Sequence, residues 1–316
     1  MPDLTVVKPK TPLLDRLVSD YLASGRARGL SPKTIRYAQG YPLRGVFLPW
    51  CAKQDITEPA QLTTRVVERF QTELLDVGGP RGPLARTTVW SYVKAVRGFI
   101  DWMRSEGEEV QAKVRLPRQE HKVIEVLERD EIDRLEAAAD SERDKLIVRV
   151  LADTGMRVGE LVKLRDSDLG VQDRRRHYLK VRRKGSRERL VPIDAALAGR
   201  LNRYITRTRP GDTDTDRLFV SRRRTAGGAY QPITESGIQQ MVRDLAERAG
   251  IKKRVHPHLF RHSAATYMLQ RGMNPLSVAH VLGHTNLAMI ERVYAHLTFR
   301  DDHQALIQAL RGDGDD

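Results

Sequence analysis

The sequence predicts a mainly α-helical protein of two units, the second of which adds a small antiparallel β-sheet. Its 316 residues exceed what one compact core usually holds, which favours about two domains. Apolar residues recur at three- and four-residue steps through most of the chain, as they do on the buried face of a helix. Over residues 177–193 the pattern changes to that of two short strands.

Four short helices are expected at the start of the chain. Ser31 followed by Pro32 has the chemistry of a helix N-cap with proline at the first helical position, and this cap begins the second helix. Gly40, Pro42 and Pro49 leave open whether the second helix is continuous. The four helices are expected over residues 13–22, 31–52, 66–74 and 89–103.

A charged stretch with Pro117 in its middle follows the fourth helix and is typical of an interdomain linker. We therefore expect a helical domain at residues 1–112, a linker at 113–124 and a second domain at 125–316. In the second domain, helices resume at Leu127. The expected strands are residues 177–183 and 189–193, joined by a tight turn at 184–186, with a third at 218–220.

Composition restricts the class of protein. The formal net charge of +14 is typical of a protein with a polyanionic partner, although basic proteins of other kinds share it. The single cysteine, Cys51, excludes an internal disulfide framework and a cysteine-rich zinc module, and its apolar neighbours predict a place in the core. We find no signal peptide and no membrane-spanning run, so we expect a cytoplasmic protein with no membrane partner.

Polar clusters in the second domain suit phosphoryl transfer at a DNA diester. Arginines can hold the charge on the non-bridging oxygens, a lysine in a cationic pocket can protonate the leaving oxygen, and histidines can move protons. A tyrosine hydroxyl can act as the nucleophile, and neither a metal nor another cofactor is expected. The clusters are Arg157 with Glu160, Lys184 in the hairpin turn, His258–Arg261–His262 at a helix start, and Leu282–Gly283–His284 followed by Tyr294.

Each of these residues also has an ordinary structural interpretation. A tyrosine late in a chain more often packs than reacts, and a lone arginine is usually solvated. Arg182, Arg183 and residues 174–176 form either a DNA-facing stripe or a solvated one. His258 and His262 would share a helix face, but no acidic or cysteine ligand accompanies them, so a zinc site is not expected.

In their order, these clusters resemble the tyrosine recombinase, or phage integrase, family. The family pattern T-G-x-R-x-x-E-L, K-G-x-x-x-R-x-V-P, H-x-x-R-H, L-G-H and a final tyrosine appears in order over about residues 125–300. The region before it, including Leu30–Thr34, resembles the family's helical core-binding domain, a SAM-like DNA-binding domain. The resemblance implies that this domain and an α+β catalytic domain form a clamp around double-stranded DNA.

The resemblance also assigns a role to each candidate residue. Glu160 and His262 would be supporting residues. The catalytic set would be Arg157 and Arg261 as the phosphate clamp, Lys184 as general acid, His258 and His284 as proton-transfer and hydrogen-bonding groups, and Tyr294 as the nucleophile that forms a 3′-phosphotyrosine. Candidate DNA contacts are Lys33, Arg36, Lys94, Arg97, Arg182 and Arg183.

Two features depart from the family pattern. Tyr294 lies ten residues after His284, where many family members have nine, and Phe260 stands where leucine is commoner. Tyr230 and Tyr267 both precede the L-G-H box, so Tyr294 remains the candidate nucleophile.

The resemblance implies a site-specific recombinase that exchanges strands through a Holliday junction, as a homo-tetramer on paired sites. A directionality factor is a further candidate partner. We expect integration and excision of a phage or mobile element, at the nucleoid of a bacterial host. The alternatives are a Xer-like chromosome or plasmid dimer resolvase, a type IB topoisomerase and a catalytically silent DNA-binding protein. The apolar stripe at residues 297–310 would dock on a neighbouring protomer or pack on its own domain.

Overall fold

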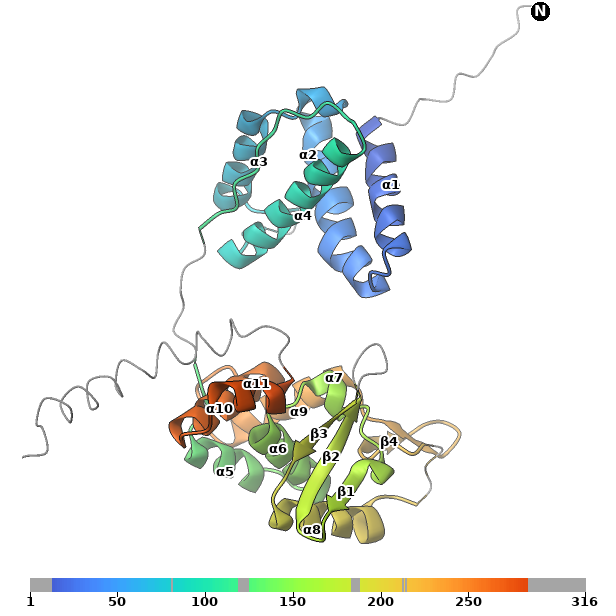
Figure 1. The fold of residues 1–316 in the computed structure, drawn as a ribbon, viewed down its shortest axis with the longest axis vertical. Coiled ribbons are helices and arrows are strands. Elements are labelled where there is room, and N and C mark those ends of the chain that lie inside the picture. The colour runs from blue at the N-terminus through green and yellow to red at the C-terminus, as the bar shows by residue number, and fades with distance from the viewer. Residues whose placement is uncertain are drawn as a thin grey trace, which may run out of the picture. The chain divides into compact units, whose positions relative to one another are not determined.

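The computed structural model describes residues 13–80, 82–118, 125–182, 188–211, 213 and 215–283 (Figure 1). The chain divides into two compact units between Lys122 and Val123, inside the segment expected to be a linker. Each unit has its own hydrophobic core. The architecture is mainly helical with small antiparallel sheets, which confirms the predicted fold class.

The first unit consists of helices that each bury one apolar face in a shared core. Thr63 caps the third α-helix, because its side chain accepts the Val66 N–H at 3.3 Å. The elements of this unit are α1 (Leu13–Ala27), η1 (Thr34–Phe47), α2 (Leu48–Lys53), the short 3-10 helix η2 (Pro59–Gln61), α3 (Thr64–Asp76) and α4 (Arg86–Ser105).

The second predicted helix continues along the backbone but changes its winding. Ser31 Oγ accepts the Thr34 N–H at 3.1 Å, as the capping pattern predicts. From Thr34 the chain forms the π-helix η1, which contains Pro42, and it continues as α2 with Pro49 in its first turn. The wider i→i+5 turn accommodates Pro42, whose ring would collide with the carbonyl four residues earlier in an α-helix.

The second unit packs helices against a three-stranded antiparallel sheet of order β1-β2-β3, and it has a separate two-stranded sheet (Figure 1). Its helices are α5 (Arg129–Ala137), α6 (Glu142–Thr154), α7 (Val158–Leu161), η3 (Asp166–Asp168), α8 (Ala195–Arg203), η4 (Tyr204–Thr208), α9 (Glu235–Arg248), α10 (Pro257–Gln270) and α11 (Pro275–Leu282). Its strands are β1 (Leu169–Gln172), β2 (Arg176–Arg182), β3 (Glu188–Pro192), β4 (Val220–Arg224) and β5 (Tyr230–Pro232).

The two strands of the predicted hairpin are present, since β2 pairs antiparallel with β3 and places Leu179 opposite Val191; the predicted turn at 184–186 lies outside the described residues. Strand β1 has no counterpart among the predicted strands. The third predicted strand, at residues 218–220, is wrong in position: β4 begins at Val220, and Leu218 and Phe219 are buried just before it. A short apolar run is equally typical of a strand and of a core-facing connection, and here its first two residues belong to a connection.

Helices α6, α10 and α11 are neighbours in the second unit (Figure 1). α6 ends at Gly155 with φ 58°, and α11 ends at Gly283 with φ 66°, both in the left-handed region that favours glycine. A Cβ on Gly155 would lie 2.4 Å from Leu282 Cδ2. Glycine at this position therefore allows the end of α11 to approach the end of α6.

Candidate active site

Arg157 lies in the tight connection between α6 and α7, where its extended backbone precedes the first turn of α7. Its backbone N–H donates to Glu160 Oε2 at 3.0 Å, and its Nη1 donates to Glu160 Oε1 at 3.2 Å. The side chain remains 38% exposed. Glu160 therefore fixes the base of a guanidinium whose remaining donors are available to a ligand.

Arg261 is the second candidate clamp residue, and its side chain is buried. Its Nη1 donates to the Gly155 carbonyl and its Nη2 donates to the Leu282 carbonyl, both at 2.7 Å. Burying a guanidinium is costly unless its donors are satisfied, and these carbonyls satisfy two of them. The two predicted arginines thus meet around the ends of α6 and α11, because Arg157 also donates to Gly283 O at 3.4 Å.

His258 lies in the first turn of α10, next to this cationic site. Partial burial, and then the charges of Arg261 and Arg157, lower the pKa of His258 below its ordinary value. The imidazole is therefore neutral near pH 7 and can accept a proton. The positive end of the helix dipole adds to a field that favours an anion here.

His256 and His262 flank this residue on the same helix. His256 is the N-cap of α10, and its Nδ1 accepts the Leu259 N–H at 3.2 Å. His262 is half-buried, and its Nδ1 meets no hydrogen-bond partner among the described residues. Burial, followed by the neighbouring His258 and His256, lowers the pKa of His262. A structural role accounts for His256, and the supporting role of His262 stays a prediction.

Arg189 belongs to this constellation although it is absent from the predicted site residues. Its Nη2 donates to Glu160 Oε2 at 2.7 Å, so the buried Glu160 carboxylate joins Arg189 to Arg157. Burial alone would raise the pKa of Glu160, but Arg189, the Arg157 N–H and the Arg157 charge lower it below its ordinary value. A sequence signal for Arg189 exists, since it is the arginine of the K-G-x-x-x-R-x-V-P pattern.

Four predicted site residues, Lys184, Arg183, His284 and Tyr294, lie outside the described residues. Gly283, the residue before His284, is within hydrogen-bonding distance of Arg157. Arg182, the last residue of β2, is joined to Lys184 by one residue and ends beside the buried Asp168. The described part of the site therefore contains the phosphate-clamp candidates, His258 and the two supporting residues.

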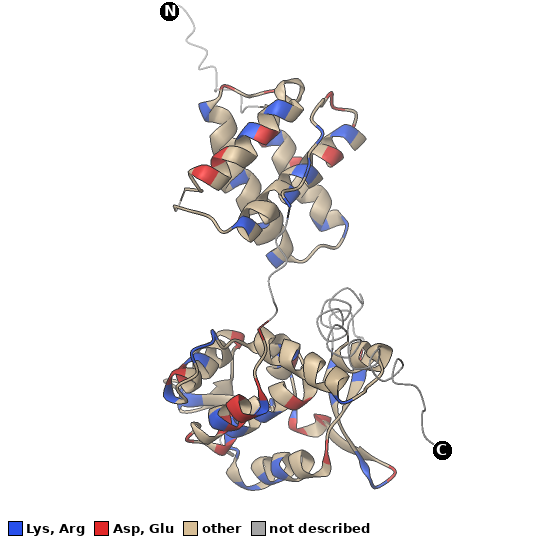
Figure 2. Ribbon diagram, turned by 90° about the vertical axis from the view of Figure 1, so that its left-hand side faces the viewer, with Lys and Arg blue, Asp and Glu red and all other residues tan. Residues whose placement is uncertain are grey.

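The candidate DNA contacts of the first unit, Lys33, Arg36, Lys94 and Arg97, are all exposed. Lys and Arg residues lie on the helices of both units (Figure 2). Arg97 Nε lies 3.6 Å from Asp101 Oδ2, whereas Lys94 Nζ lies 4.8 Å from the centre of the Trp90 ring. Arg182 differs, because its Nη1 donates to Asp168 Oδ2 at 2.5 Å. A structural ion pair accounts for Arg182, and its contact with DNA stays a prediction.

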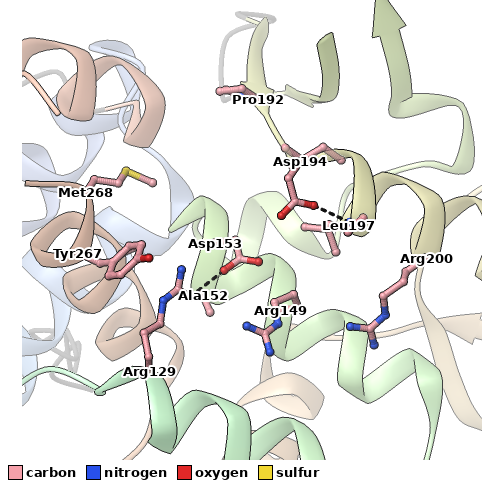
Figure 3. Close-up of a pocket in the computed structure, with 13 residues that line it drawn as sticks. Arg129, Arg149, Ala152, Asp153, Pro192, Asp194, Leu197, Arg200, Tyr267 and Met268 are labelled. Atoms are coloured by element: carbon pink, nitrogen blue, oxygen red, sulfur yellow. Dashed lines mark hydrogen bonds and ion pairs between the residues drawn. The ribbon is translucent and has the colours of Figure 1, made fainter. Parts of the chain in front are cut away.

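A hollow of about 590 Å³ lies elsewhere in the second unit, between α5, α6, α8 and α10 (Figure 3). Arginines line it, but each is paired with a carboxylate. Arg129 Nη1 lies 2.9 Å from Asp153 Oδ1, and Arg200 Nη1 lies 2.6 Å from Glu136 Oε1. Of the predicted catalytic residues, Arg157, His258 and Arg261 are described, and none of these three lines the hollow, so we do not assign phosphate chemistry to it.

Possible metal ligands and a single thiol are also present among the described residues. No cluster of three or more histidine, cysteine or carboxylate side chains there could hold a metal ion. Cys51 is buried, and burial raises the pKa of its thiol to about 12, which agrees with a core position. Among the described residues, no helix is both long enough and apolar enough to cross a bilayer.

Comparison with known proteins gives a consistent assignment. The phage integrase family model matches residues 125–301. The chain is 31% identical over 298 residues to a tyrosine recombinase of Pseudothermotoga lettingae, covering 93% of this chain and 96% of that protein. It is 26% identical over 283 residues to tyrosine recombinase XerD of Listeria innocua, covering 86% and 90%. The fold matches XerH site-specific recombinase in a post-cleavage complex with a palindromic difH substrate, with TM-score 0.70, 18% identity and coverage of 96% and 90%.

Proposed function

The chain belongs to the phage integrase family and is a site-specific tyrosine recombinase, and we propose that it cleaves and rejoins DNA through Tyr294. The observation that carries this proposal is the convergence of Arg157 and Arg261 at the ends of α6 and α11. Two guanidiniums fixed near one point can stabilise the negative charge that develops on a phosphodiester during transfer, and the neutral histidine beside them can accept a proton.

In the proposed step, Tyr294 Oη attacks the scissile phosphorus and the bond from phosphorus to the 5′-oxygen breaks. The tyrosine proton passes to His258, and Lys184 gives a proton to the leaving 5′-oxygen. Arg157, Arg261 and His284 stabilise the charge on the non-bridging oxygens. The product is a 3′-phosphotyrosine and a free 5′-hydroxyl. Attack by the 5′-hydroxyl of another strand reverses the step and yields a Holliday junction.

Covalent capture tests this proposal and identifies the target sequence in the same experiment. The full-length protein is incubated with nicked duplexes of randomised core sequence, and DNA that survives denaturing washes on the protein is sequenced. We expect enrichment of one core sequence with the wild-type protein and no covalent DNA with Tyr294→Phe. Capture that persists in Tyr294→Phe would assign the nucleophile to another residue. The absence of any wild-type adduct would favour the silent DNA-binding alternative.

For the first unit we propose a DNA-facing surface formed by η1 and α4. The stretch from Asp20 to Asp55 contains no acidic residue between its ends, and neither does the stretch from Asp76 to Asp101. These segments form η1 and most of α4, which pack together with the Tyr41 and Tyr92 rings 6.1 Å apart. Attraction of such basic surfaces to phosphates weakens as salt rises.

We propose that strand exchange requires a homo-tetramer on two paired core sites. The apolar stripe at residues 297–310, outside the described part of the chain, is the candidate for docking on a neighbouring protomer. Removing residues 301–316 should then impair pairing of two sites, measured by native gels, more than binding to one site. Unchanged recombination by the shortened protein would contradict docking between protomers.

For the biological role we propose integration and excision of a phage or mobile element, in the bacterial cytoplasm at the nucleoid. Relatives named XerC and XerD favour the alternative of resolving chromosome or plasmid dimers. The captured core sequence allows a direct comparison of two sites on one circular plasmid with two sites on separate molecules. Efficient exchange only within one plasmid would favour the resolvase, and relaxation of supercoils without exchange would indicate a topoisomerase. A directionality factor would change the ratio of excision to integration.

A further inference from the structure

The C-terminal end of α11 accepts hydrogen bonds from three arginines, which lie in β3, in α10 and in the connection between α6 and α7. The carbonyls of Val281, Leu282 and Gly283 accept hydrogen bonds from Arg189, Arg261 and Arg157 respectively. The last carbonyls of a helix lack partners within the helix and form the negative end of its dipole. Three guanidiniums therefore provide hydrogen-bond donors for the last carbonyls of α11, directly before His284 in the sequence.

Arg189 differs from the other two arginines in its strand position. It lies in β3 two residues before the buried Val191, so both side chains point to the same inward face. Leu190 between them is 49% exposed, whereas the Arg189 side chain is only 8% exposed. The strand thus buries a charge and exposes a leucine, which is the reverse of the usual alternation. A buried charge in this position requires compensation by specific partners.

Those partners are a carboxylate and a helix end. Arg189 Nη2 donates to Glu160 Oε2 at 2.7 Å, and its Nη1 donates to the Val281 carbonyl. A Cβ on Gly283 would lie 2.7 Å from Arg189 Nε, so the guanidinium fills the space beside the left-handed glycine. Arg189 therefore joins β3, α7 and the end of α11 through one side chain.

We propose that Arg189 is a positioning residue for strand cleavage: it fixes Glu160 and the end of α11, and thereby sets the position of Arg157. Both hydrogen bonds described above, from Nη1 and Nη2, go to protein acceptors, as expected of a positioning residue. This inference depends on the proposed function, in which Arg157 acts on the phosphate. A displacement of about 1 Å in a catalytic group can cost about 100-fold in rate, so loss of this anchor should slow cleavage without weakening DNA binding.

The test compares Arg189→Met with the wild type in the full-length protein on the captured core duplex. We expect single-turnover covalent cleavage to fall about 100-fold. The Kd for DNA should change by less than about twofold, and the slope of log K against log salt should stay the same, since a lost phosphate contact changes it by about one. Arg189→Lys, which keeps the charge but cannot fork onto both acceptors, should recover part of the rate.

A double-mutant cycle separates positioning from a general loss of structure. If Arg189 acts through Arg157, Arg189→Met should cost less than about threefold in an Arg157→Ala background. Because Arg189→Met removes one of the two arginines that pair with the buried Glu160 and can unfold the protein, Arg189→Met is also compared with its parent in a Glu160→Gln background, where the carboxylate is neutral. Arg200→Met is the matched control, since Arg200 is a partly buried arginine paired with Glu136 and Glu142 outside the site. Its cleavage rate should equal that of the wild type.

Three results would overturn the proposal. The first is a cleavage rate within about twofold of the reference, which is the wild type for folded Arg189→Met and Glu160→Gln for the double variant. The second is an equal loss of rate with and without Arg157, as additivity predicts for independent sites. The third is a salt slope reduced by about one, as for a direct phosphate contact. Failure of the proposed function is recognised separately, because the wild type would then form no adduct or Tyr294→Phe would retain it.

Discussion

In the helical unit, aliphatic and aromatic side chains fill the core, with the Phe70 ring 5.1 Å from those of Phe47 and Trp50. The second unit has a comparable apolar core but adds charged groups to its interior. Among the described residues, the polar and charged residues that are buried as a whole lie in the second unit: Asp144, Thr154, Glu160, Asp168, Arg261 and Ser263. The Arg189 side chain, also in this unit, is only 8% exposed. In the helical unit, Lys33, Arg36, Lys94 and Arg97 are all exposed.

This difference follows from what each unit does with its charge. A surface that attracts a polyanion needs exposed cations and tolerates small displacements, because the attraction acts over a distance of about 10 Å. A phosphate clamp needs guanidiniums fixed at defined positions, and burial against carbonyls and carboxylates provides that fixation. The two units therefore respond differently to loss of charge, and the following predictions test that contrast in order of decreasing effect.

The largest effect is expected at the buried clamp. Arg261→Lys should reduce single-turnover cleavage about 1,000-fold, because an ammonium cannot span Gly155 O and Leu282 O while it also contacts phosphate. Arg36→Lys on the exposed surface should change the rate by less than about threefold at saturating protein. Covalent adduct formation on a nicked duplex measures both. Comparable losses in the two variants would remove the distinction between the units.

Stability should show the same contrast. Asp144 is 1% exposed and pairs with Arg143 and Arg222, so Asp144→Asn should cost about 3–5 kcal/mol of unfolding free energy. Asp101 pairs with Arg97 and Arg104 on the surface, so Asp101→Asn should cost less than about 0.5 kcal/mol. Urea unfolding followed by circular dichroism measures both. Equal losses of unfolding free energy would contradict the expectation that the buried Asp144 stabilises the second unit more than the exposed Asp101 stabilises the helical unit.

Binding should respond to charge at the start of η1, where Lys33 is the N-cap, without a change in chemistry. Lys33→Gln should lower the slope of log K against log salt by about one and leave the maximal cleavage rate within about twofold. Arg65→Gln is the control, because Arg65 is an exposed cation on α3, outside the two acid-free segments. A larger change of slope for Arg65→Gln would place the DNA on another face of the helical unit.

The smallest expected effect is a pH dependence confined to the second unit. The pKa values of His256, His258 and His262 are all lowered, first by burial. The folded state then binds fewer protons than the unfolded state just below pH 6.5, so unfolding free energy falls as the pH is lowered through that window. Residues 13–118 contain no histidine, so the helical unit should be insensitive there.

The chain offers separate reporters for this measurement. All three tryptophans, Trp50, Trp90 and Trp102, belong to the helical unit, so tryptophan fluorescence follows that unit alone in the intact protein. Circular dichroism reports the unfolding of both units. As the pH falls from 7.5 to 5.5, the urea midpoint measured by fluorescence should stay constant. The circular dichroism transition of the second unit, which has no counterpart in fluorescence, should move to lower urea concentration. His262→Gln should reduce that movement. Equal movement of both signals would show that the pH dependence is not local to the second unit.

Local signals in the sequence predict much of the fold. The apolar stripes locate α1, α3 and α4, the Ser31 cap is present, and the H-x-x-R-H pattern does open α10. Strand β1 escapes prediction because Gly170 is typical of a turn. In the structure Gly170 lies opposite Tyr178, and a Cβ there would be 2.4 Å from the ring. The π-helical winding around Pro42 also depends on packing that no local pattern states.

The sequence by itself determined the types and order of the charged residues, and the family pattern assigned Arg157 and Arg261 as partners across about a hundred residues. Only the tertiary structure decided that Arg189 joins them, because a buried arginine is recognised by acceptors that packing brings together. Those acceptors are Glu160 in α7 and the Val281 carbonyl in α11. Propensity and periodicity act over a few residues, whereas contacts between β3, α7 and α11 depend on how whole elements pack.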